Sequence, residues 1–163
     1  GYSSAASDVY KRQVCELLYH YGKYLMISGS RRGGQPLNLQ GQWNANIRPA
    51  WSSNYTVNIN TQMNYWGASL CGLQECLEPY LRMVHEVCKR GGKTAKVNYG
   101  CRGFACNHNV DLWRKTAPVI GESNYMYAPL CGVWLANEIY EHYLNGGLDA
   151  ERDTVLELSL IHI

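Results

Sequence analysis

The sequence predicts an all-α protein, and more specifically part of an α/α toroid, from three observations. Apolar residues recur at helical spacing in four segments, the connections between them alternate between short and long, and no strand-rich block appears. In a toroid the long connections gather at one face and form a cleft. An ordinary helical bundle is the alternative that the same pattern allows.

The first two predicted helices flank a long polar loop. Residues 14–28 carry apolar side chains at helical spacing and are followed by a glycine-containing segment that ends the helix. Residues 35–56 form the loop, and its length indicates a functional role. A short helix is predicted over 61–70, with Thr61 as its N-cap.

Two further helices flank a second long loop. Residues 78–89 show an apolar stripe, with a proline in the first turn where a helix tolerates it. The pair Gly91-Gly92 is expected to break or kink this helix, and residues 93–99 to resume it. Residues 100–123 form the second polar and aromatic loop. Residues 129–144 form the last helix, which two glycines stop.

The two ends of the chain look foreign to the rest. Residues 4–13 and 158–163 resemble the translated sequencing-adapter tails found on some metagenomic reading frames. We therefore expect residues 1–13 and 158–163 to be non-native, which leaves one partial domain over residues 14–157. A genuine polar N-terminal tail and a genuine apolar C-terminal strand are the alternative.

Composition narrows the class of protein. With 163 residues, 46% hydrophobic and 17% charged, the chain has the makeup of a folded globular domain. The net charge of +2 comes without a basic patch, so no nucleic-acid partner is expected. No apolar run reaches the length of about 18 residues that a membrane span needs.

The seven cysteines are an odd number, which argues against a disulfide framework. The pairs Cys71/Cys76 and Cys101/Cys106 share a C-x4-C spacing that some structural zinc sites use. Ordinary thiols are the favoured interpretation, and no metal or organic cofactor is expected.

Residues 38–66 have the composition of a sugar-binding cleft. They include no acidic residue, but seven asparagines, three glutamines, three tryptophans and two tyrosines. Aromatic faces stack on sugar C–H groups, and neutral amides bind hydroxyls. Within this segment Asn58 and Asn60 stand two apart, so an extended backbone would place both on one face, with Val57 and Ile59 anchored in the core. Capping of loop backbone by both asparagines is the alternative.

Few carboxylates are available for chemistry. Glycoside hydrolysis usually requires two. Asp111, in a polar loop, either binds a ligand or braces the loop. Glu141 and His142 point to different faces of the last helix, so only one can reach a shared site. His108 is expected to donate a hydrogen bond rather than to bind a metal.

Several strings, in order, resemble one family. They are NLQGQWN, AWSSNYTVNINTQMNYW, ECLEPYL, GGKTAKVNYGCRGFACNHNVDLW, TAPV and WLANEIYEHYL. Together they are similar to the catalytic domain of glycoside hydrolase family 95, the inverting α-L-fucosidases, from about Leu17 to Gly146. The resemblance implies an (α/α)6 barrel, of which this would be the early portion. It also implies hydrolysis of terminal α-1,2-linked fucose, or a related L-galactose, from a fucosylated oligosaccharide or glycan, and a secreted or periplasmic location.

The resemblance also implies roles for particular residues. Asn58 and Asn60 match the asparagine pair that positions the attacking water. The general acid Glu and the relay Asp of the family match no residue of this chain, so the isolated chain is expected to be inactive, and a non-catalytic carbohydrate-binding fragment is the alternative. The substrate pocket would be lined by Trp43, Trp66, His108, Asn109, Asp111, Trp113 and Trp134.

Two departures from the family pattern fall in the region expected to bind substrate. The first His of the family's H-H-N-T-D-x-W loop is Asn107 here, and residues 127–135 differ from W-P-M-G-G-x-W-L. A partial toroid also leaves helix faces uncovered, so we expect poor solubility or loose packing of the isolated chain.

Overall fold

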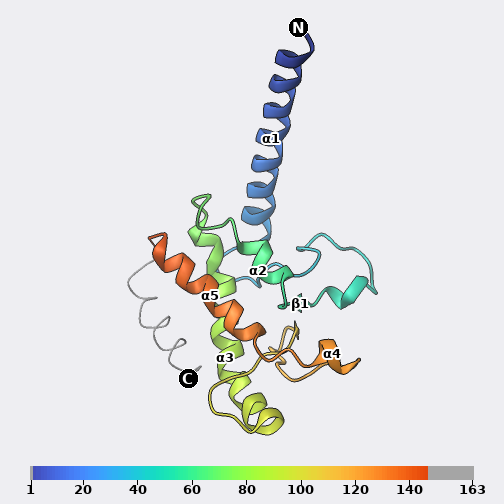
Figure 1. Cartoon of the computed structure of the whole chain (residues 1–163), viewed down its shortest axis with the longest axis vertical. Helices are drawn as coiled ribbons and strands as arrows, with labels where there is room; N and C mark the ends of the chain where they lie inside the picture. Colours follow the sequence, from blue (N-terminus) through green and yellow to red (C-terminus); the bar gives the residue numbers. More distant parts are fainter. Residues whose placement is uncertain (1, 147–163) are drawn as a thin grey trace.

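A computed structural model describes residues 2–146, which are mostly helical (Figure 1). In chain order the elements are α1 (Tyr2–Gly29), η1 (Ala50–Ser53), β1 (Tyr55–Thr56), α2 (Asn60–Tyr65), η2 (Gln74–Leu77), α3 (Glu78–Tyr99), β2 (Asn109–Val110), α4 (Ser123–Met126) and α5 (Cys131–Leu144). The predicted all-α class and its four main helices are confirmed. The complete (α/α)6 toroid stays a prediction.

Helix α1 projects away from the other elements (Figure 1). It begins at Tyr2 rather than at Val14, so the predicted N-terminal tail is helical here. Its apolar stripe is largely exposed: Leu17 and Leu18 are 68% and 62% exposed. Uncovered helix faces of this kind are expected of a partial toroid. The non-native origin of the tail stays a prediction, and residues 158–163 lie outside the described residues.

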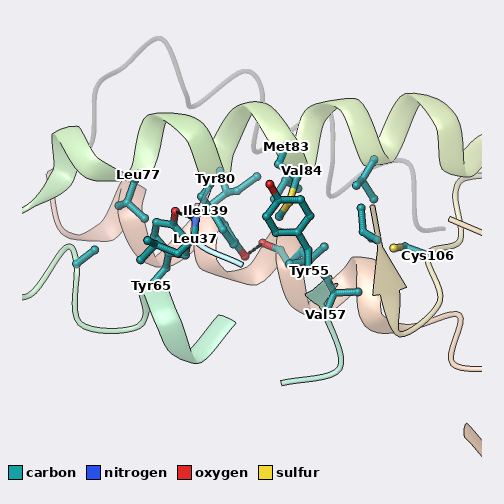
Figure 2. Packing of buried hydrophobic residues seen from close by; sticks show 14 of the residues in the cluster. Leu37, Tyr55, Val57, Tyr65, Leu77, Tyr80, Met83, Val84, Cys106 and Ile139 are labelled. Atoms are coloured by element: carbon teal, nitrogen blue, oxygen red, sulfur yellow. Dashed lines mark hydrogen bonds between the residues drawn. The ribbon is translucent and has the colours of Figure 1, made fainter. Parts of the chain in front are cut away.

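The core lies where α3 packs against α5 and α2 (Figure 2). Tyr80 of α3 is fully buried, and its hydroxyl donates to the carbonyl oxygen of Leu135 on α5 at 2.9 Å. Its ring lies 4.9 Å from that of Tyr65 on α2, a contact that adds to the area both rings bury. Farther along α3, Met83 is fully buried in the same cluster. This core fixes the helices that carry the two long loops.

The expected break at Gly91-Gly92 is wrong, because α3 runs without interruption to Tyr99. Gly91 is buried against the chain that follows the helix. A Cβ added there would lie 2.8 Å from the carbonyl oxygen of Ala105. Gly91 therefore permits a close approach of backbone to helix. The helix ends instead at Gly100, whose φ of 63° is the left-handed conformation typical of a C-terminal glycine.

The segment around Asn58 differs from its prediction. Only Tyr55–Thr56 is extended; residues 57–59 form a turn, and α2 begins at Asn60. Val57 is fully buried as expected, but Ile59 is 42% exposed. Thr61 is not the N-cap of α2, since it is buried and its hydroxyl donates to the carbonyl oxygen of Thr56 at 3.0 Å. The helix also ends at Tyr65, five residues earlier than predicted.

Two short strands lie within the predicted loops. β1 and β2 pair in antiparallel fashion, with Tyr55 opposite Val110 and Thr56 opposite Asn109. Strands this short have no periodic signal, which is why the sequence did not reveal them. Their pairing holds the two long loops together. Within residues 2–146, no helix has the length and apolar character to cross a membrane.

Candidate functional site

The β1–β2 pair brings the two long loops into contact at one place. One further bond extends it, from the backbone N–H of Val57 to the carbonyl oxygen of His108 at 2.7 Å. The residues after β1 and before β2 are therefore neighbours in space. As a result, Asn58 comes from one loop and His108 from the other to the same cavity.

The cavity has a volume of about 1020 Å³. Its walls combine neutral amides, hydroxyl groups, aromatic rings and aliphatic side chains with one lysine. The residues that line it are Leu39, Trp51, Ser52, Asn54, Thr56, Asn58, Asn60, His108, Asn109, Lys115, Val119, Ile120 and Tyr125. Within the part of the chain that the structure describes, this lining includes no Asp or Glu.

Asn58 and Asn60 both line this cavity, although not for the predicted reason. Asn58 lies in the turn after β1 and Asn60 is the first residue of α2, so a tight turn brings the two amides to one cavity. Both residues are exposed, and among residues 2–146 neither side chain makes a hydrogen bond. Their donors and acceptors are therefore open to a bound molecule.

A chain of side-chain hydrogen bonds orients His108 at the wall. The Thr56 hydroxyl donates to Asn109 Oδ1 at 3.0 Å, which leaves the Asn109 amide group to donate to His108 Nε2 at 3.1 Å. In a neutral imidazole, Nδ1 then carries the proton. Nδ1 is buried and has no partner among the described residues. The ring also meets Tyr125 edge-on, with centroids 5.8 Å apart.

Arg114 ties the second loop to the helical core. Its side chain is 3% exposed, and it donates to Glu86 Oε2 on α3 and to Gln35 Oε1 on the first loop, each at 2.7 Å. Asp111 Oδ1 accepts the backbone N–H groups of Trp113 and Lys115, each at 2.9 Å. The Asp111 carboxylate therefore braces the loop. This is one of the two roles predicted for Asp111, the other being ligand binding.

The structure brings only some of the predicted pocket residues together. His108 and Asn109 line the cavity. The other five lie outside its lining, namely Trp43, Trp66, Asp111, Trp113 and Trp134. Trp43 instead lines a smaller hollow of about 290 Å³ beside α1. Trp113 is 73% exposed.

Asn107, the departure from the family loop, does not line the cavity. It is fully buried, and its Oδ1 accepts hydrogen bonds from the Tyr99 hydroxyl at 2.8 Å and from the Ala128 backbone at 2.9 Å. Its amide group donates to the carbonyl oxygen of Thr116 at 2.9 Å. Asn107 thus holds the loop in shape, and the expectation that this departure affects the choice of sugar stays a prediction.

Nine of the thirteen lining residues were not singled out by the sequence analysis, and Trp51, Tyr125 and Lys115 carry the largest side chains with polar groups among them. Trp51 belongs to the stretch with sugar-cleft composition but was not singled out there. Tyr125 comes from α4, which has four residues and too few for a periodic signal. Lys115 lies in the second loop, where nothing in the sequence marks it as facing the first.

The cavity is suited to a neutral, polyhydroxylated molecule. Amides and a histidine can bind hydroxyl groups, while Trp51, Tyr125 and the aliphatic side chains can contact C–H surface. The seven cysteines are free thiols, and within residues 2–146 no group of three or more His, Cys, Asp or Glu could hold a metal ion. The fold and the site therefore define a helical domain with a polar and aromatic cavity between two long loops.

Comparison with known proteins identifies the family. The model of the glycosyl hydrolase family 95 catalytic domain matches residues 2–150. Alpha-L-fucosidase 2 of Arabidopsis thaliana is 44% identical over 130 residues, which cover 80% of this chain and 15% of that protein. Probable alpha-fucosidase A of Aspergillus niger is 36% identical over 132 residues, 80% of this chain and 16% of that protein. The chain belongs to glycoside hydrolase family 95, and it spans only a small part of the length of these relatives.

Proposed function

We propose that this chain forms part of the substrate cleft of an inverting α-L-fucosidase that acts on terminal α-1,2-linked fucose or a related L-galactose. One observation carries the proposal: Asn58 and Asn60, two amides whose side chains make no hydrogen bond within residues 2–146, open onto the same cavity between the long loops. The family and the names of its relatives supply the reaction class.

The amides would orient water rather than deprotonate it. An asparagine carbonyl accepts a hydrogen bond from water, and its amide group donates to a carboxylate that acts as the base. Inverting hydrolysis uses two carboxyl groups about 6.5–9.5 Å apart, with room for that water between them. The lining described within residues 2–146 has no Asp or Glu. The family resemblance also matches neither the general acid nor the relay Asp to a residue of this chain, so we assign both carboxylates to protein outside it. His108 and Asn109 would bind sugar hydroxyls.

The test uses the enzyme encoded by the uninterrupted parent gene, with 2′-fucosyllactose as substrate. Asn60→Ala should lower kcat by about 10²–10⁴ with a smaller change in KM, because the water is held mainly for the chemical step. Asn98→Ala is the matched control, since Asn98 is exposed at the far end of α3 and does not line the cavity. Equal kcat values for the two variants would overturn the role of Asn60.

A second function for the isolated chain is carbohydrate binding without hydrolysis. The absence of a carboxylate from the described cavity lining favours it. It predicts that the chain binds a fucoside and releases no fucose from 2′-fucosyllactose. Hydrolysis by this chain alone would refute the assignment of both carboxylates to protein beyond it.

A further inference from the structure

Trp51 is a large aromatic side chain at the cavity to which the proposed function gives no role. It is 78% exposed, and it lines the cavity together with Asn58 and Asn60. An indole combines a wide apolar face with little conformational freedom, which makes it an efficient contact surface for a ligand. The backbone that presents this side chain is also unusual.

The η1 turn holds three consecutive non-glycine residues in the left-handed region. The φ angles of Trp51, Ser52 and Ser53 are 54°, 56° and 47°. Any residue with a Cβ is disfavoured there, and such conformations persist only where the surroundings hold them. Strained backbone of this kind gathers at ligand-binding positions, so its occurrence at the cavity points to a role for the turn.

Gln40 holds the turn in this conformation. Its amide group donates to the carbonyl oxygen of Ala50 at 3.0 Å, and its Oε1 accepts a hydrogen bond from the Ser53 hydroxyl. The turn is therefore fixed at both ends, while the indole between them is left exposed. The strained backbone therefore holds the Trp51 side chain exposed at the cavity instead of burying it in the core.

Helix α4, which follows the second loop, supplies another aromatic ring to the same cavity. Tyr125 lies edge-on to His108, and its ring passes so close to Gly121 that a Cβ there would overlap the Tyr125 hydroxyl oxygen. Gly121, with φ of 154°, thus leaves room for this ring position. One aromatic residue from the first loop and one from α4 therefore reach the cavity that the two asparagines also line.

We propose that Trp51 is a substrate-positioning residue whose indole packs against the apolar face of the fucose ring, with Tyr125 as the second aromatic contact. The proposal rests on the proposed function, since it assigns the sugar to this cavity. Stacking on the indole fixes the plane of the fucose ring. The amides of Asn58 and Asn60 then hydrogen-bond to the sugar hydroxyl groups or to the attacking water. Without the indole the sugar loses contact area and a defined orientation.

The test measures binding of methyl α-L-fucopyranoside to the 163-residue chain by saturation-transfer NMR titration. Trp51→Ala should weaken binding about tenfold, and Trp51→Phe should retain most of the affinity because an aromatic face remains. Tyr24→Ala is the control: Tyr24 is 60% exposed on α1, away from the cavity lining, and its loss should leave the affinity unchanged. Sugar addition should also change the tryptophan fluorescence of the wild type, and this change should be absent in Trp51→Phe.

The outcomes separate this inference from the proposed function. Equal affinity of the wild type and Trp51→Ala would overturn the role of Trp51 and leave fucoside binding in place. Absence of saturation transfer to the wild-type chain would overturn fucoside binding by this chain and the inference with it, whereas the proposed function is tested separately by Asn60→Ala in the parent enzyme. Because Trp51 is exposed, Trp51→Ala should fold like the wild type, which far-ultraviolet circular dichroism verifies.

Discussion

Arg114→Met should loosen the second loop and lower the stability of the chain. The guanidinium is buried and donates to Glu86 and Gln35 at 2.7 Å each, with weaker contacts to the carbonyl oxygens of Asp111 and Leu112. Methionine retains much of the side-chain volume but no donor. It therefore removes the hydrogen bonds between the loop and the core and leaves most of the packing.

The magnitude follows from the exposure of the partners. A hydrogen bond to a charged group contributes about 1.5–3 kcal/mol. The Glu86 side chain is 41% exposed, so in the variant water can hydrogen-bond to its carboxylate in place of Arg114. The two carbonyl contacts, at 3.4 Å and 3.3 Å, are weak. We therefore expect Arg114→Met to lower the free energy of unfolding by roughly 2–3 kcal/mol, below the simple sum of its bonds.

Urea denaturation measures this loss, and hydrogen exchange locates it. The backbone amides of residues 107–115 should exchange faster in Arg114→Met, while those of α3 beside Tyr80 change less. Arg102→Met is the matched control, because Arg102 is exposed and should contribute less than about 0.5 kcal/mol. If both variants unfold at the same urea concentration, Arg114 does not fix the second loop to the core.

Two further predictions concern stability. Burial, with repulsion from Glu141, raises the pKa of the Glu138 carboxyl from 4.5 to about 6. The folded state then binds this proton more tightly than the unfolded chain, so the Glu138 contribution should lower stability by roughly 2 kcal/mol as pH rises from 4.5 to above 6. Glu138→Gln should remove that pH dependence in urea titrations; an unchanged dependence would contradict the shift. Ser52→Gly should raise the free energy of unfolding by roughly 0.5–1 kcal/mol, because glycine relieves the left-handed strain, and a loss of stability would show that the strain is absent.

Apolar stripes that continue over several helical turns were the most reliable guides to the fold. The apolar stripe of α3 is long enough to identify the helix, and the following left-handed Gly100 ends it. Gly91 misled the prediction because its role depends on Ala105, which only the tertiary structure brings near. β1 and β2 gave no signal at all, since each has two residues and forms only through its partner.

The candidate site was predicted in part. Asn58 and Asn60 were singled out from their spacing and from family resemblance, and both line the cavity, but a turn rather than a strand brings them there. The tryptophans were chosen by residue type and family resemblance, and neither determines the direction in which a side chain points. Trp51 could be distinguished from Trp113 only once the pairing of the two loops showed which of them faces the cavity.

The most direct test of the central claim follows the side-chain amide resonances of Asn58 and Asn60 by NMR while methyl α-L-fucopyranoside is added to the chain. The account predicts that both pairs of amide resonances shift along one saturable curve, together with the ring resonances of His108. Shifts confined to residues around Trp43, with Asn58 and Asn60 unchanged at saturation, would contradict it.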